Sequence, residues 1–569
     1  MNSTFKVVFN KARGALMVVN EVTSSVQAKG TKTVIATAVT ALMAGSAMAA
    51  SVIPDMPSDV TETEETTAWD EVQADGQYHF QNEGAQGAFT TVTAGKDAEF
   101  SGKLWVSAIG ADSDATGLNV YGKGAVVTNK GEIYVTTDTT GVEWRNEAIL
   151  ADNSAKAVNA GKIVVKNAYG MRVGTTAPAT IENAGTIIVE ERGVGMELGG
   201  GAASEGSVAT NNGSIIVGDI AEGKYGHGVL IKDAKKVIFN NNGLIQAGEG
   251  ATAIDVQLES GKETSAEINL GEKSQIDGLI NIGAGTKVTL NAKGMSGKLQ
   301  VKAADGTTTL NVADGSNVEL VDEQKSVFEQ VNVEKGTLTA SIWGDDNTFK
   351  SVTVKENGVF NITKLNSGGN KDDLASKPHD TLLISRGQDF TYDHAQMYVA
   401  GKVFTGNLKV GGLDTNHKGT VTLKGGEHSF TKLTVGANDS AFKVQEGAVV
   451  TVGSLHLYHG ASTAGTVVVD GSTLINTGAL TFEKADATYS AEGKLELNNG
   501  TFQTAATDFF KKKETAAAEA EAQPEYEVTG NGAFLSGNGT LNLTSEAFEF
   551  TLQQLSDAQA TINLSLIHI

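Results

Sequence analysis

Six copies of a short asparagine–glycine repeat limit what this chain can fold into. They read FSGKLWV from Phe100, NKGEIYV from Asn129, NAGKIVV from Asn159, NAGTIIV from Asn183, NNGSIIV from Asn211 and NNGLIQA from Asn241. The shared glycines, from Gly102 to Gly243, are spaced by 29, 30, 24, 28 and 30 residues. A period of roughly 20 to 50 residues is typical of folds in which each repeat is one unit stacked on the next.

The apolar residues of each repeat fall into three clusters. One follows the shared glycine, as in Ile163–Val165, a second follows another glycine, as in Gly170–Val173, and a third leads into the next asparagine, as in Val237–Phe239. Alternate residues of a strand point to opposite faces, so each cluster supplies one or two inward side chains. The pattern predicts an all-β fold, a right-handed parallel β-helix with three short strands per coil.

The Asn-x-Gly steps are predicted to form the corners between strands. Asn and Gly both tolerate left-handed backbone, which we expect a sharp corner to require. Stacked coils would place equivalent asparagines about 4.8 Å apart, close enough for an amide ladder. The expected corner residues are Asn129, Gly131, Asn159, Gly161, Asn183, Gly185, Asn211, Gly213, Asn241 and Gly243.

The charge and the lack of cysteine restrict the class of protein. The formal net charge is -23, which disfavours a nucleic-acid partner because such binding depends on Lys and Arg neutralising phosphates. The chain has 0 cysteines, which suits a protein that crosses an oxidising compartment unfolded.

The first 49 residues contain the parts of an export signal. Lys29 and Lys32 precede an apolar stretch, 33–44, which is followed by Ala47-Met48-Ala49. Such a stretch falls short of the roughly 20 residues needed to span a bilayer, so we predict cleavage between Ala49 and Ala50.

An extension precedes this signal and reads FKVVFNKARGALMVVNE from Phe5 to Glu21. It resembles the extended signal peptide region of type V secretion proteins of Gram-negative bacteria, the autotransporters and their relatives, with departures at Ser3-Thr4 and Phe9. The resemblance implies partners in the Sec export machinery and the outer-membrane assembly machinery. It also implies passage through the periplasm to the outer-membrane surface or the extracellular space.

The remaining chain divides into three expected parts. Residues 50–75 hold eight acids and no base, so we expect a mobile acidic tail behind the equally mobile leader. Residues 76–563 form the β-helical passenger, clearest over 100–260, with a helical or mobile excursion at 507–523. Residues 564–569 resemble translated sequencing adapter, and we expect a fragment that ends before the translocator barrel of the autotransporters.

A search for chemistry finds no catalytic motif and predicts neither a metal nor a cofactor. There is no GxSxG or Walker sequence. Asp112–Gly117 begins like a calcium loop, but Lys123 replaces the required Glu. His456 and His459 would point to opposite faces of a strand. Gly368–Asp372 only half matches a calcium-binding nonapeptide and does not repeat.

The sequence therefore favours a non-catalytic surface passenger, an adhesin-like or aggregation-promoting rod with an unknown ligand and unknown ligand-binding residues. Two alternatives remain open. One is a two-partner secretion exoprotein, and the other is a β-helical enzyme that degrades polysaccharides. An enzyme would need clustered carboxylates beside Arg or Lys, whereas arginine is rare here and the acids are expected to be spread through turns.

Overall fold

The structure is a computed structural model that describes residues 5–10, 15–20 and 52–564. Within the last range the gaps are 65, 83–86, 109–112, 138–145, 200–204, 223, 259–262, 322–325, 343–346, 364–380, 413–416, 438, 459–462, 483–492, 505–509, 513–525, 529–534 and 545–560. The chain forms two units, Met1–Ala50 and Ser51–Ile569.

In the first unit, the leader that was expected to be mobile contains a strand pair. β1 (Phe5–Asn10) pairs antiparallel with β2 (Ala15–Asn20). The extension is rich in Val and Phe, which favour strands.

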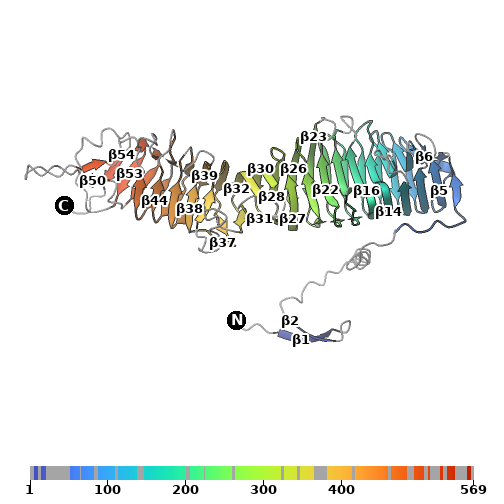
Figure 1. The fold of residues 1–569 in the computed structure, drawn as a ribbon, viewed down its shortest axis with the longest axis horizontal. Coiled ribbons are helices and arrows are strands. Elements are labelled where there is room, and N and C mark those ends of the chain that lie inside the picture. Colours follow the sequence, from blue (N-terminus) through green and yellow to red (C-terminus); the bar gives the residue numbers. More distant parts are fainter. Residues whose placement is uncertain are drawn as a thin grey trace, which may run out of the picture. The chain divides into compact units, whose positions relative to one another are not determined.

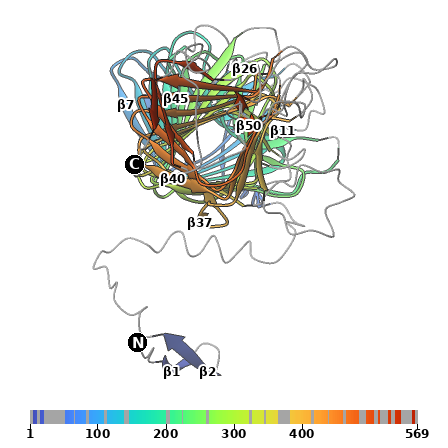
Figure 2. The same ribbon diagram turned by 90° about the vertical axis from the view of Figure 1, so that its left-hand side faces the viewer.

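The second unit is a parallel β-helix, which confirms the predicted fold class (Figure 1). Strands of successive coils pair in parallel along the stack, and Figure 2 looks along it at walls that enclose a common core. The first wall is a sheet of β7 (Asp97–Phe100), β10 (Val126–Asn129), β13 (Lys156–Asn159), β15 (Thr180–Asn183), β17 (Val208–Asn211), β20 (Val237–Asn241), β23 (Thr264–Leu270), β26 (Thr286–Lys293), β28 (Thr308–Ala313), β30 (Ser326–Val333), β32 (Asn347–Val354), β35 (Gln388–Asp393), β39 (Gly419–Lys424), β42 (Ala441–Gln445), β45 (Thr466–Asp470), β48 (Lys494–Asn498) and β52 (Leu535–Gly537).

A second sheet forms the other two walls of the N-terminal coils. The second wall contains β3 (Thr61–Thr63), β5 (Gln77–Asn82), β8 (Lys103–Ala108), β11 (Glu132–Thr137), the first parts of β14 (Lys162–Val173) and β16 (Thr186–Gly199), β18 (Ser214–Val217), β21 (Leu244–Ala247) and β24 (Gln275–Asp277). The third wall contains β4 (Thr67–Ala68), β6 (Gly87–Thr93), β9 (Ala115–Tyr121), β12 (Glu147–Asp152), the second parts of β14 and β16, β19 (Gly226–Lys232), β22 (Thr252–Gln257), β25 (Leu279–Ile282) and β27 (Ser296–Ala303).

Toward the C-terminus the same sheet continues and two smaller sheets replace it. The continuation comprises β29 (Asn317–Leu320), β31 (Thr337–Ala340), β33 (Val359–Ile362), β36 (Tyr398–Val399) and β37 (Lys402–Val403). One small sheet contains β34 (Thr381–Ile384), β38 (Asn407–Val410), β41 (Lys432–Val435), β44 (Leu455–Leu457) and β47 (Leu480–Phe482). The other contains β40 (Glu427–Phe430), β43 (Val449–Val452), β46 (Thr473–Asn476), β49 (Thr501–Thr504), β53 (Thr540–Leu543) and β54 (Thr561–Leu564).

The core is a continuous column of inward side chains. In the second wall the residue two positions after each shared glycine forms an isoleucine column whose members pair in register and are fully buried. They are Ile133, Ile163, Ile187, Ile215 and Ile245. Because each coil buries its side chains against its neighbours, the coils stabilise one another rather than folding singly.

The corner glycines are present for a reason different from the one predicted. None of the five from Gly131 to Gly243 has a left-handed backbone. A Cβ at Gly161 would instead collide with the carbonyl oxygen of Gly131, and the same overlap recurs at each corner of this series. The prediction of left-handed corners was wrong, because what excludes a side chain is the close approach of successive coils.

The acidic segment predicted to be a mobile tail is largely part of the stack. β3 pairs with β5 and β4 pairs with β6, followed by a short 3-10 turn, η2 (Trp69–Glu71). Trp69 and Val72 pack against the core. The segment cannot form a core of its own, but it can add to an edge and a surface that the first coils already provide.

The predicted excursion at 507–523 lies mostly outside the described residues. Its described part, β50 (Phe510–Lys512), pairs antiparallel with β51 (Tyr526–Val528) and is therefore strand, not helix. No helix in the described residues is both long and apolar enough to cross a bilayer.

Candidate functional site

The predicted corner asparagines form a buried hydrogen-bonded column. Each amide nitrogen donates to the Oδ1 of the next coil's asparagine, and every donor–acceptor distance is 2.8 Å. The column runs from Asn129 through Asn159, Asn183 and Asn211 to Asn241. All five are fully buried. The column ends where Asn241 Nδ2 donates to Ser274 Oγ at 2.6 Å. A buried, satisfied ladder of this kind holds the coils in register and offers no surface to a ligand.

The other residues singled out from the sequence lie mostly outside the described part of the chain. Ala47, Ala49 and Ala50, together with Asp112, His459 and 368–372, lie outside the described residues. His456 stacks on Tyr458, with ring centroids 4.3 Å apart. Among the residues that can be described, no group of three or more His, Asp or Glu side chains could hold a metal ion.

The outer face of the first wall carries a second asparagine ladder, which sequence analysis missed. Here the direction is reversed: from the second member on, each amide nitrogen donates to the Oδ1 of the preceding coil's asparagine, at 3.0, 3.0, 2.7 and 2.8 Å. Its members are Asn240, Asn269, Asn291, Asn311 and Asn332. The signal was available, because most of these asparagines interrupt an apolar pair, as in Leu310-Asn311-Val312.

A column of uncharged side chains lies beside this outer ladder. Thr289, Thr309, Gln330 and Ser351 pair in register on consecutive strands of the first wall. The two columns together give an uncharged hydrogen-bonding strip, the "polar strip" below, on a chain whose net charge is -23.

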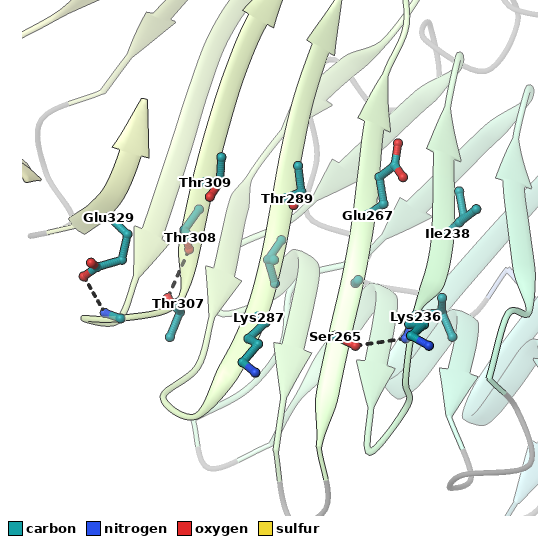
Figure 3. A pocket seen from close by; sticks show the side chains of 14 residues that line it. Lys236, Ile238, Ser265, Glu267, Lys287, Thr289, Thr307, Thr308, Thr309 and Glu329 are labelled. Carbon is teal, nitrogen blue, oxygen red and sulfur yellow. Dashed lines mark hydrogen bonds between the residues drawn. The ribbon is translucent and has the colours of Figure 1, made fainter. Parts of the chain in front are cut away.

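A shallow cavity of about 650 Å³ opens over one end of the polar strip. Figure 3 shows Thr289 and Thr309 on neighbouring strands, with Lys236 and Lys287 nearer the strand starts. Two bonds shape the rim: Lys236 N donates to Ser265 Oγ at 2.9 Å, and Gly306 N donates to Glu329 Oε1 at 3.0 Å. The lining holds hydroxyls, lysines and glutamates, which can hydrogen-bond to a polar partner.

A second cluster is charged and lies on the outer side of the third wall. Arg172 Nε is 2.8 Å from Glu197 Oε2, and Arg172 Nη1 is 3.7 Å from Glu147 Oε2. Thr116 Oγ1 donates to Glu147 Oε1 at 2.6 Å. The parallel register sets Arg172 beside Glu197 on adjacent coils, although the two residues are 25 apart in the sequence.

Burial governs the titration of this Glu147–Arg172–Glu197 cluster. Both glutamate side chains are almost inaccessible, at 4% and 6% exposure. Burial raises the pKa of Glu147 to about 7, against the opposing effects of Arg172 and Thr116. Burial also raises the pKa of Glu197, opposed chiefly by Arg172. The expectation that acids are spread through turns was therefore wrong at these positions.

The same wall carries a histidine–carboxylate pair farther along the stack. His227 Nδ1 lies 3.2 Å from Asp255 Oδ2, and both side chains are buried. Burial lowers the pKa of His227, and the Asp255 carboxylate opposes that shift. Asn281 Nδ2 donates to the other Asp255 oxygen at 2.8 Å, so the aspartate is held from two sides.

Comparison with known proteins identifies the leader. Residues 1–50 match the family model described as the extended signal peptide of the type V secretion system. The leader is therefore an extended signal peptide of the type V secretion system. Such a signal implies Sec export, passage through the periplasm, assembly at the outer membrane, and delivery to the cell surface or beyond. Comparisons with curated proteins and with solved structures give no match.

Proposed function

We propose that this type V secretion protein is a non-catalytic, adhesin-like or aggregation-promoting rod of the cell surface. The observation that carries the proposal is the combination of a type V leader with a parallel β-helix in one chain. A stack of coils is stiff and presents each outward column along its whole length. Its ligand contacts are therefore expected on the walls rather than in a single deep pocket.

The polar strip is the surface that best supports adhesion. It is uncharged, regular and continuous over several coils. Such a strip can hydrogen-bond repeatedly to an extended, hydroxyl-rich or amide-rich partner. Many weak contacts along a rod add to strong attachment when several engage together.

Bead assays test this function. The exported chain, purified after leader removal, is coupled to beads, which should clump or adhere to cells more than beads carrying an inert protein. Thr289→Lys with Thr309→Lys places two charges on the polar strip and should reduce attachment. Thr451→Lys with Thr473→Lys, on another wall, should not. Equal settling of all four bead types would contradict the proposal.

A polysaccharide-degrading enzyme is the second candidate, favoured by the Glu147–Arg172–Glu197 cluster. Two carboxyl groups in different environments, one with a pKa raised to about 7, can supply an acid and a base for glycoside hydrolysis. Their near-complete burial and shared arginine argue for a structural role instead. Release of reducing sugar from a glycan panel, abolished in Glu147→Gln, would establish the enzyme; no turnover by the native chain would exclude it.

A further inference from the structure

The first residues of the second unit cross the outer side of the second wall. We call residues 52–60 the N-terminal strap. Ile53 and Val60 pack against an outward cluster of Trp105, Tyr134 and Val164. At its beginning, the backbone N–H of Val52 donates to the carboxylate of Glu190. Glu190 belongs to β16 and Trp105 to β8, so the strap spans several coils.

A cavity of about 530 Å³ lies between the N-terminal strap and this wall. Ile53, Pro54, Asp55 and Met56 form one side. The other side consists of outward side chains of β5, β8, β11 and β14, among them Trp105, Tyr134 and Thr136. Its volume is within the range of small-ligand sites, which are typically about 300 to 1,000 Å³.

One buried donor in this cavity lacks a partner. Trp105 is only 7% exposed, and its Nε1–H makes no hydrogen bond to any residue that the structure describes. A buried indole N–H normally has an acceptor. Tyr134 stacks on the same indole at 5.3 Å and 26°, which fixes the ring in place. The indole N–H is therefore a fixed donor without an acceptor among the described residues, on a side chain that lines the cavity.

The neighbouring groups define what kind of acceptor fits. Lys166 already pairs with Glu191 at 3.0 Å, and His79 Nδ1 lies 2.6 Å from Glu62 Oε2. Asp55 adds a carboxylate to the strap side, so an anion is disfavoured. Thr136 supplies a hydroxyl, and Asn167 keeps its Oδ1 as an acceptor because Nδ2 donates to the carbonyl of Thr137 at 3.1 Å. The set combines neutral donors and acceptors with the apolar edges of two aromatic rings.

We propose that this cavity binds a neutral saccharide residue, with Trp105 Nε1 donating to a sugar hydroxyl, ring or acetamido oxygen. The N-terminal strap forms one side of the site, so the site is complete only when residues 52–60 are seated. Saccharides offer both C–H surface and neutral oxygens, which match the ring edges and the hydroxyl and amide groups. The proposal is independent of the polar strip, which lies on a different wall.

A glycan array and a matched pair of tryptophan variants test the proposal. The leader-processed chain should bind a subset of neutral glycans. Trp105→Phe keeps an aromatic ring but removes the indole N–H, and should weaken that binding at least tenfold while leaving the fold intact. Trp69→Phe removes an indole N–H outside the cavity and should bind as the native chain does.

A strap variant separates the contribution of the strap from that of the indole. Ile53→Asp removes an apolar contact with the Trp105 cluster and should lower glycan affinity, with a circular dichroism spectrum like that of the native chain. Two results would overturn the proposal: absence of any neutral glycan among the bound ligands, or unchanged affinity in Trp105→Phe. Binding of peptides in place of glycans would assign the cavity to another partner class and count equally against it.

Discussion

The coils around residues 129–245 and those around 326–442 build the same stack with different interiors. The earlier coils contain the buried asparagine column and an isoleucine column, both repeating without interruption. The later coils bury phenylalanines instead. Phe328 and Phe349 stack at 5.4 Å and 11°, and Phe349, Phe360 and Phe390 continue edge to face at 5.6 and 5.9 Å.

The difference shows two ways of holding coils in register. An amide ladder joins residues only when they sit at equivalent positions, so it requires a regular corner in every coil. Aromatic rings tolerate tilt and offset while still burying large areas. The later coils can therefore vary their corners and loops. Most of the outer asparagine ladder lies between these two regions, on the outside of the first wall.

The largest expected effect is at a corner glycine of the earlier coils. Gly161→Ala should destabilise the stack by about 4 kcal/mol or more, because the new Cβ would overlap the backbone of the preceding coil. Gly336→Ala in the later coils should lose only about 1 kcal/mol, since its Cβ would lie 3.1 Å from Ser316 O and from Val312 Cγ1. Urea unfolding followed by circular dichroism measures both, and equal losses would contradict the distinction.

Truncation within the phenylalanine series should come next. Phe349→Ala removes the ring between Phe328 and Phe360 and should lower stability by about 3–5 kcal/mol. Ile187→Val in the isoleucine column should lose only about 1 kcal/mol, as a small aliphatic truncation. In Phe349→Ala, backbone amide hydrogen exchange should become faster in the later coils. Loosening of the earlier coils instead would show that the two interiors are not separate.

Breaking the buried amide column should have an intermediate effect. Asn183→Ala removes two 2.8 Å bonds and leaves the amides of Asn159 and Asn211 without these partners. Unsatisfied buried polar groups make a loss of about 2–4 kcal/mol reasonable. Adding Asn211→Ala to Asn183→Ala should lower the free energy of unfolding by less than Asn183→Ala does alone, because the two residues share a hydrogen bond. Additive losses in the double variant would mean that the column does not act as a unit.

The pH response of Glu147 belongs to the earlier coils alone. Burial raises its pKa from 4.5 to about 7. Arg172 and Thr116 oppose this shift, and the negative charges of Glu197 and Asp114 add to it. A carboxyl with a raised folded pKa stabilises fully below 4.5, and that contribution is lost as pH rises toward about 7. The loss should be about 3 kcal/mol at most, and Glu147→Gln should flatten it. An identical pH profile in the variant would assign the slope to other groups.

The predictability of each region from sequence follows from the same contrast. The earlier coils were predictable because one asparagine and one glycine recur at fixed offsets from an Ile-x-Val run. The charged cluster on the outer side of these coils was not predictable from sequence, because Glu147 and Arg172 come together only through the pairing of β12 with β14. The N-terminal strap was also missed, because its few apolar residues gain their contacts from Trp105 and Tyr134, which lie far along the sequence.

The smallest expected effect is at the outer ladder, where the same residue type serves a different purpose. Asn311→Ala removes two side-chain hydrogen bonds, of 2.7 and 2.8 Å, on a partly exposed face where water can replace them. Stability should change by no more than about 0.5 kcal/mol. Attachment in the bead assay should fall instead, because the polar strip loses a hydrogen-bonding side chain at its centre. A stability loss as large as that of Asn183→Ala, with attachment unchanged, would mean that the outer ladder only holds the coils in register. The polar strip would then lose its main support as a contact surface.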